Sequence, residues 1–313
     1  MTDLPVPAPA PAPPRPGGLQ LRGVDGSIRP GWAVLLFVAL AGVAFLAEMA
    51  LSMLLLGRVL GALRLGDPAG WALISARAAW VASVTWICCR VVDWRFGDAY
   101  LRDARWPVRL GQGVALGTGA FCLVVLVPLA LGHERFSAST EGAGTLAAGF
   151  LWTALTCGAI AISEEMLVRG FALRQLERGI GRIGAAAATS VAFGLLHVLN
   201  PNASWLAIAN ITLVGLWLAV TVQRTGSLWL ATGGHFAWNL TQAFAWGEPV
   251  SGFPVRASLL VRGAPGDELW TGGDFGPEAS IAATAVMGLL AAATLAWDRR
   301  VPRTARPGPD PLV

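Results

Sequence analysis

The sequence predicts an all-α membrane protein, a polytopic bundle of about eight transmembrane helices. The first observation is composition: of 313 residues, 55% are hydrophobic and only 13% are charged, whereas about a quarter of the residues in a soluble domain are charged. The second is the length of the apolar runs, which suffices to cross about 30 Å of hydrocarbon at about 1.5 Å per helical residue. The third is the placement of the arginines between those runs.

Apolar runs of that length follow one another along the chain. We expect helices at about 31–57, 71–92, 111–132, 150–176, 183–200, 203–222, 227–247 and 278–297. The fourth run is polar in its second half and the fifth is short. The segment 248–277 contains several Gly, Pro and acidic residues and is too polar to cross the membrane.

The arginines predict the orientation, because every basic residue of the chain is an arginine. With the N-terminus in the cytoplasm, sixteen arginines fall in cytoplasmic segments and five in outer segments, while Arg77 and Arg169 lie within predicted helices. The positive-inside rule therefore predicts a multi-pass protein of the cell (inner) membrane with both termini in the cytoplasm. The arginines are scattered and form no basic face, so we expect a lipid environment and no nucleic-acid partner.

Charged side chains inside a bilayer are costly and are usually functional or paired. The segment AISEEMLVRGFALRQLERG contains Glu164, Glu165 and Arg169. Glu165 precedes Arg169 by four residues, the spacing at which a helical ion pair meets, and Glu164 is rotated by about 100° and can face elsewhere. We therefore expect Glu165 to pair with Arg169 and Glu164 to be suited to proton transfer. The alternative is that both glutamates are solvated at a helix end.

Two later segments carry polar pairs at helical spacing. ATSVAFGLLHVLN places His197 four residues after Phe193 on one helix face, and LATGGHFAWNLTQ places Asn239 four residues after His235. Taken singly, such residues are often packing residues or polar contacts between helices. Their depth favours one site, because Glu164 and His197 each lie about 21 Å along a helix from its cytoplasmic end, and His235 and Asn239 about 12 and 18 Å.

The three motifs resemble those of a known family in kind and in order. They are Glu164-Glu165-x-x-x-Arg169, Phe193-x-x-x-His197 and His235-x-x-x-Asn239. They resemble the motifs of the CPBP (Abi) family of CAAX-protease and bacteriocin-processing membrane peptidases, which includes the type II CAAX prenyl endopeptidases. The resemblance covers roughly residues 145–246 and implies hydrolysis of peptide bonds of a membrane-associated protein or peptide, in a cavity reached from the membrane.

The residue chemistry agrees with that activity. Glu164 is expected to act as the general base that deprotonates a water molecule, which His197 orients. His235 and Asn239, one turn apart, are expected to donate hydrogen bonds to the developing oxyanion. Glu165 and Arg169 are expected to lock the helix and to tune Glu164 electrostatically.

Other interpretations stay open at this stage. The chain has no HExxH motif, but Glu164, His197 and His235 could hold Zn²⁺ with an open position; we favour chemistry without a metal or cofactor. A non-catalytic membrane-binding or bacteriocin-immunity-type protein on the same fold is the alternative function. A secondary transporter would be expected to show internal repeats, and we find none.

The chain divides into five parts on this interpretation. They are a disordered Pro-rich cytoplasmic tail (1–30), N-terminal transmembrane helices (31–144), a CPBP-like catalytic core (145–246), an extracytoplasmic loop (247–277), and a last transmembrane helix with a cytoplasmic tail (278–313).

One further pair lies outside the resemblance. Glu48 is expected about 26 Å along the first helix and Arg77 about 9 Å below the outer surface in the second, so their depths nearly coincide. An unpaired charge in such apolar helices is expensive. We therefore expect an ion pair between them, the alternative being that Arg77 extends to the interface and Glu48 is protonated or bonds the backbone.

Overall fold

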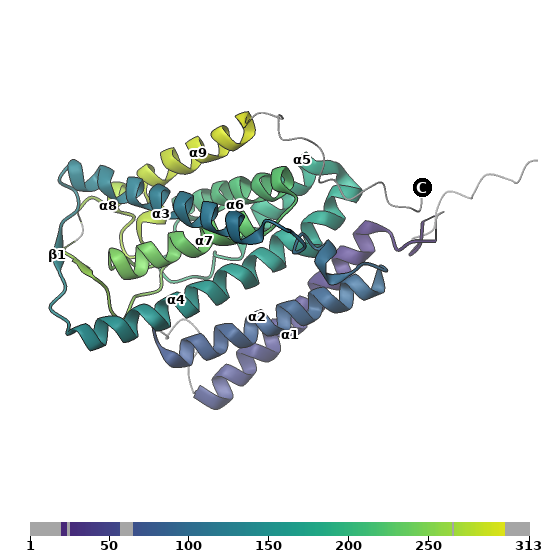
Figure 1. Ribbon diagram of the computed structural model, residues 1–313, viewed down its shortest axis with the longest axis horizontal. Coiled ribbons are helices and arrows are strands. Elements are labelled where there is room, and N and C mark those ends of the chain that lie inside the picture. Colours follow the sequence, from purple (N-terminus) through teal and green to yellow (C-terminus); the bar gives the residue numbers. More distant parts are fainter. Residues whose placement is uncertain (1–19, 24–25, 57–64, 265, 298–313) are drawn as a thin grey trace, which may run out of the picture.

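The computed structural model describes residues 20–23, 26–56, 65–264 and 266–297. Most of the tail predicted over 1–30, and all of the chain after residue 297, lie outside these residues. The helices are α1 (Pro30–Leu56), α2 (Pro68–Val91), α3 (Trp106–Ala130), α4 (Ala143–Glu165), α5 (Phe171–Leu195), α6 (Trp205–Thr225), α7 (Trp229–Leu240), α8 (Glu268–Thr271) and α9 (Ile281–Ala296) (Figure 1).

Short elements connect or extend these helices. They are the π-helical turns η3 (Met166–Gly170) and η4 (Thr241–Ala245), the 3-10 turns η2 (Phe96–Asp98) and η5 (Pro277–Ala279), and the strands β1 (Phe136–Ala138) and β2 (Leu260–Arg262). The two strands pair antiparallel, with Phe136 opposite Arg262. Apart from this three-residue ladder, the all-α prediction is confirmed.

The apolar helices confirm a multi-span architecture, although not eight crossings. Five helical stretches of the described chain are long and apolar enough to cross a membrane: Pro30–Leu54, Pro68–Val91, Trp106–Ala130, Ala143–Leu195 and Trp205–Thr225. At 12 and 16 residues, α7 and α9 are too short to count on their own. Large apolar side chains on the outside remain uncovered, with Leu199 95% and Ile183 89% exposed, as expected of a surface that faces lipid.

The fourth and fifth predicted segments form one stretch with a sharp break. Helical hydrogen bonding continues from α4 through η3 into α5, but Gly181 has φ 76° and ψ 170°, a conformation that an L side chain rarely adopts. The prediction that His197 lies on the helix with Phe193 is wrong, because α5 ends at Leu195 and His197 lies in the following turn. Gly194 lies in the last turn of α5, but the apolar sequence runs on through the end of the helix.

Glycines bring α3 and α7 into backbone contact. A Cβ atom added to Gly117 would lie 2.2 Å from the carbonyl oxygen of Gly234, and one added to Gly113 would lie 2.2 Å from that of Leu230. From the other side, a Cβ on Gly233 would lie 2.3 Å from the carbonyl of Leu110. Small residues at such spacing let membrane helices approach closely, and here they fix α7 between α3 and α4 (Figure 1).

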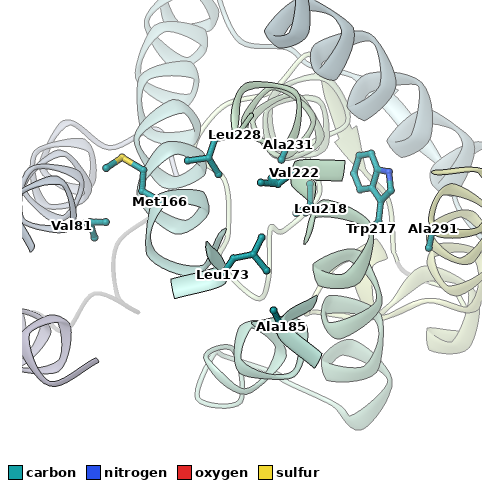
Figure 2. Close-up of a cluster of buried hydrophobic side chains, with 10 residues drawn as sticks. All are labelled: Val81, Met166, Leu173, Ala185, Trp217, Leu218, Val222, Leu228, Ala231 and Ala291. Carbon is teal, nitrogen blue, oxygen red and sulfur yellow. The ribbon is translucent and has the colours of Figure 1, made fainter. Parts of the chain in front are cut away.

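The largest buried apolar cluster joins six parts of the bundle. Figure 2 shows its members converging from α2, η3, α5, α6, the start of α7, and α9: Val81, Met166, Leu173, Ala185, Trp217, Leu218, Val222, Leu228, Ala231 and Ala291. Met166 directly follows Glu164 and Glu165 in the chain, so this cluster packs against the segment that carries the two carboxylates. Trp217 approaches α7, with a ring atom 3.1 Å from the position of a Cβ on Gly234.

The predicted ion pair between α1 and α2 is confirmed. Arg77 Nη2 lies 3.0 Å from Glu48 Oε1, and Arg77 Nε also donates to this carboxylate. Trp80 Nε1 donates to Glu48 Oε2 at 2.9 Å. The Glu48 side chain is 4% exposed, so the charge is buried together with its partner, as a carboxylate in an apolar helix requires.

The described ends of the chain lie at one end of the bundle. Gly179 of α5 contacts Pro30, the first residue of α1. Arg182 donates to a carbonyl in the last turn of α6, and Arg224 in that same turn donates to the carbonyl of Leu295 near the end of α9. The strand pair and α8 lie at the opposite end (Figure 1).

Candidate active site

The glutamate pair lies where α4 passes into the π-helical turn η3. Arg169, in that turn, lies 3.1 Å from Glu165 (Nη1 to Oε1), and both side chains are fully buried. Single π turns inside α-helices occur frequently at functional sites, because they alter which side chains share a face. The predicted pairing of Glu165 with Arg169 is therefore present, in the interior of the bundle rather than at a solvated helix end.

The Arg169 guanidinium is held by more than its ion pair. Its Nη2 donates to the carbonyl of Gly215 in α6 at 3.3 Å, and its Cζ lies 4.0 Å from the centre of the Phe193 ring. A Cβ on Gly215 would lie 3.2 Å from that Nη2. The absence of a side chain at residue 215 thus leaves room for the buried cation.

His235 of α7 joins the two glutamates. Its Nδ1 lies 3.0 Å from Glu165 Oε1, and its Nε2 lies 3.8 Å from Glu164 Oε2. An ionised carboxylate only accepts hydrogen bonds, so Nδ1 is protonated and donates a hydrogen bond to Glu165. This contact fixes the ring and points Nε2 toward Glu164, whose side chain is 23% exposed and accessible.

His197 reaches the same place from the turn after α5. Its Nδ1 lies 2.8 Å from the carbonyl oxygen of Phe193, which can only accept, so Nδ1 donates and Nε2 is left for other partners. The Phe193 ring packs edge-on against both histidines, with centroid distances of 4.9 Å to His197 and 6.1 Å to His235. Phe193 therefore spaces the two imidazoles while its face covers Arg169.

A small cavity lies beside these groups. Its volume is about 40 Å³, whereas one water molecule needs about 10–15 Å³ of such space. Three of the predicted residues line it: His197, His235 and Asn239. The remaining walls are largely apolar and come from α6, α7 and α9. Glu164 is not among the lining residues and reaches this group through His235.

A known family matches the part of the chain that carries these residues. Residues 145–241 match the family of Rce1-like type II CAAX prenyl endopeptidases. The chain carries an Rce1-like domain. A search of curated proteins and a search of solved structures gave no match. The family resemblance drawn from the three motifs is confirmed, and the matched residues include every predicted site residue, from Glu164 to Asn239.

The cavity of the Rce1-like domain is also lined by two polar residues that sequence reasoning missed. Ser251 and Glu278 both line it, and both follow the end of the family match at residue 241. Sequence reasoning assigned Ser251 to an outer loop and Glu278 to the start of an apolar run. The available signal was a lone acidic residue at the start of that run, where charge is expensive.

The candidate zinc ligands of the Rce1-like domain are Glu164, His197 and His235. A zinc site needs at least three such ligands, each about 2.0–2.2 Å from the metal. Within the described ranges, no three or more His, Cys, Asp or Glu side chains form a group that could hold a metal ion. The Nδ1 atoms of both histidines are already engaged by protein acceptors. We therefore derive no step through a metal.

Proposed function

We propose that this protein is an intramembrane endopeptidase that hydrolyses peptide bonds of membrane-associated proteins or peptides with a water activated by Glu164. The observation that carries the proposal is the bridge formed by His235, which binds the buried Glu165–Arg169 pair through one ring nitrogen and approaches Glu164 with the other. A residue with only a packing role needs no such arrangement of an accessible carboxylate, an imidazole and a buried ion pair.

The chemistry begins at Glu164. Its carboxylate takes a proton from a water molecule while His197 orients that water through Nε2, and the water oxygen attacks the substrate carbonyl carbon. The carbonyl oxygen becomes an oxyanion and accepts hydrogen bonds from the Asn239 amide and from His235. When the tetrahedral intermediate collapses, the C–N bond breaks and Glu164 returns the proton to the leaving nitrogen. The products are a carboxylic acid, which keeps the second proton of the water, and an amine.

Glu165 and Arg169 act on this chemistry without touching the substrate. The positive guanidinium balances Glu165, and Glu165 holds His235 through Nδ1. Donation from Nε2 to the oxyanion uses the imidazolium form of His235, in which both ring nitrogens carry a proton. In this role the pair positions the oxyanion donor, as a fixed hydrogen-bond donor costs no reorganisation during the reaction.

A cleavage assay with paired variants tests the proposal. Membrane proteins exposed to the full chain in vesicles should gain new N-termini that are missing with Glu164→Gln or His197→Ala, while both variants keep the thermal stability of the parent protein. Glu141→Gln, the same change at an exposed glutamate, is the matched control and should cleave normally. Identical termini with and without Glu164 would favour the alternative, a non-catalytic membrane-binding or bacteriocin-immunity-type protein.

The chemistry of the substrate needs a separate comparison. Peptides that carry a prenylated cysteine and the same peptides without the lipid should be offered side by side to the active protein. A preference for the prenylated form would assign a CAAX-type substrate. Equal cleavage would assign a broader class of membrane-associated peptides.

We further propose eight membrane crossings with both termini in the cytoplasm of the cell (inner) membrane. Five stretches qualify as spans by themselves, the break at Gly181 divides the longest into two, and α7 and α9 are embedded beside them. The arrangement of the described chain ends at one end of the bundle agrees with an even number. Reporter fusions at either terminus should report the cytoplasm, and an outer location of either one contradicts this topology.

A further inference from the structure

Part of the cavity wall is chain that lies beyond the Rce1-like domain. A turn around Ser251 packs there against the segment that precedes α9. Backbone contacts hold the turn: a Cβ on Gly252 would lie 2.0 Å from the carbonyl oxygen of Pro201, and one on Gly276 would lie 2.2 Å from that of Pro249. Asn200 Nδ2 also donates to the carbonyl of Ser251 at 3.0 Å. This wall is therefore a built part of the site.

Glu278 presents its carboxylate to the cavity from this wall. Its Oε2 accepts from the backbone N–H of Ser251 at 2.6 Å and from Gln242 Nε2 at 3.1 Å, and its Oε1 accepts from Ser251 Oγ at 3.0 Å. The backbone carbonyl of Glu278 accepts from Asn210 Nδ2 at 2.8 Å. The position of the carboxylate is thus fixed through both the side chain and the backbone.

The charge of this carboxylate has no cation beside it. In the described part of the chain, the arginines that form ion pairs do so with other acids, and Glu278 is only 5% exposed. Buried glutamates are rarely left without a cationic partner, because transfer of a charge from water is costly. Glu278 lines the same cavity as His197, His235 and Asn239.

A peptide that enters this cavity brings backbone N–H groups that lose their water. Each N–H needs an acceptor inside, or it costs the full desolvation free energy of an unpaired donor. On the mechanism above, His235 and Asn239 serve as donors to the oxyanion and His197 orients the water. Glu278 adds a carboxylate acceptor to the same lining. The rest of the lining is largely apolar, from Ile211, Val214 and other residues of α6 and α9.

We propose that Glu278 is a substrate-binding residue whose carboxylate accepts a hydrogen bond from a backbone N–H of the bound peptide, with an apolar substrate side chain beside that N–H. This inference rests on the peptidase function proposed above and adds to it the group that holds the peptide backbone. Ser251 and Gln242 are positioning residues, since they act on the substrate only through the Glu278 carboxylate.

A backbone-ester scan tests this contact directly. The probe is a pool of internally quenched peptides with apolar centres, offered to the full-length protein in proteoliposomes. A cleaved member is resynthesised with one N–H at a time replaced by an ester oxygen, leaving the scissile bond unchanged. In the parent protein, one replacement should lower kcat/KM by about tenfold or more, mainly through a higher KM, because a hydrogen bond to a charged acceptor is lost.

The variants decide between binding and a merely structural role. On the unmodified peptide, the kcat/KM of Glu278→Ala should be lower than that of the parent protein by a similar factor. The ester replacement that lowers kcat/KM in the parent protein should cause no further loss in this variant. Glu278→Gln keeps a carbonyl acceptor and a similar volume, so its kcat/KM should lie between those of the parent protein and of Glu278→Ala. It replaces the alanine variant in the test if that variant does not fold. Glu248→Gln is the matched control, since Glu248 is a buried glutamate of the same outer region that does not line the cavity, and it should keep the parent's ester profile.

Two outcomes overturn the inference in distinguishable ways. If the ester replacement costs the same factor in the parent protein and in both Glu278 variants, Glu278 acts only on the fold of the outer turn. If no peptide of the pool and no membrane protein is cleaved by the parent protein, the peptidase function fails and the inference fails with it.

Discussion

At the scale of single residues, the site depends on one carboxylate oxygen. Glu165 Oε1 accepts from Arg169 and from His235. One buried atom therefore sets both the charge balance of the interior and the orientation of the imidazole. A substitution that removes one of these contacts should first lower the free energy of unfolding, because an unpaired charge would remain in a water-free environment.

Replacement of Arg169 by leucine should be strongly destabilising. The change leaves Glu165 buried without its cation, and breaking one side of a buried pair costs about 3–5 kcal/mol. The double variant Glu165→Leu/Arg169→Leu should be less destabilised than Arg169→Leu alone, because it leaves no orphaned charge. Thermal unfolding in detergent measures all three proteins. Arg135→Leu, a change at an exposed arginine, should shift the midpoint little, and equal losses in the single and double variants would contradict the argument.

At the scale of elements, the glycine contact between α3 and α7 determines where His235 lies. Gly234, which directly precedes His235, has its carbonyl oxygen 2.2 Å from the position of a Cβ on Gly117. The obstacle is backbone, which cannot swing aside as a long side chain can. Any side chain at residue 117 must therefore displace one helix from the other.

Gly117→Ala should lower both stability and cleavage. The added methyl group forces α3 and α7 apart and shifts His235 relative to Glu164 and Glu165, and such overpacking typically costs about 1–3 kcal/mol. Gly119→Ala is the matched control on the same helix, because a Cβ there meets nothing within 4 Å. Thermal midpoints and cleavage rates of the two variants should diverge, and equal behaviour would show that the close contact is unimportant.

Hydropathy was sufficient to predict the elements, and helical spacing to predict part of the site. The long apolar runs marked the helices because lipid imposes continuous hydrophobicity, and four-residue spacing placed Glu165 against Arg169. The end of α5 before His197 was not predictable, since Leu196 and Val198 continue the apolar run and Gly194 near that end is no clearer a stop than Gly113 and Gly117 inside α3. Ser251 carried no signal in the sequence, and the acidic residue Glu278 at the start of an apolar run could be marked as unusual but not placed in the cavity, because only tertiary packing brings chain from outside the family match there.

At the scale of the whole molecule, the end of the bundle opposite the described chain ends carries its own buried charges. Arg262 of β2 lies 3.0 Å from Glu134 (Nε to Oε1) and 3.4 Å from Glu248 (Nη1 to Oε2). Two carboxylates thus share one guanidinium. Burial raises the pKa of Glu248 to about 8, with Arg262 acting in the opposite direction and Glu134 in the same one. Burial likewise raises the pKa of Glu134.

The protein should therefore lose stability as the pH rises from about 5 to 8. In this window the unfolded chain has released the Glu248 proton, since the ordinary pKa is 4.5, while the folded protein still holds it. Each unit of pH then lowers the free energy of unfolding by at most about 1.4 kcal/mol for this group. Glu248→Gln should flatten the dependence of the thermal midpoint on pH, whereas Glu141→Gln at an exposed position should leave it unchanged. Parallel profiles for parent and Glu248→Gln would rule out this group as the cause.

The close packing of α7 also has a consequence for biosynthesis. Even with η4, this helix is too short to qualify as a span, so transfer into lipid alone drives its insertion weakly. The glycine face of α3 supplies a complementary surface, and α3 leaves the ribosome well before α7. The helix that bears His235 thus packs against a surface of α3 that has already been synthesised. A nascent chain without that surface would retain α7, and His235 with it, at the membrane surface.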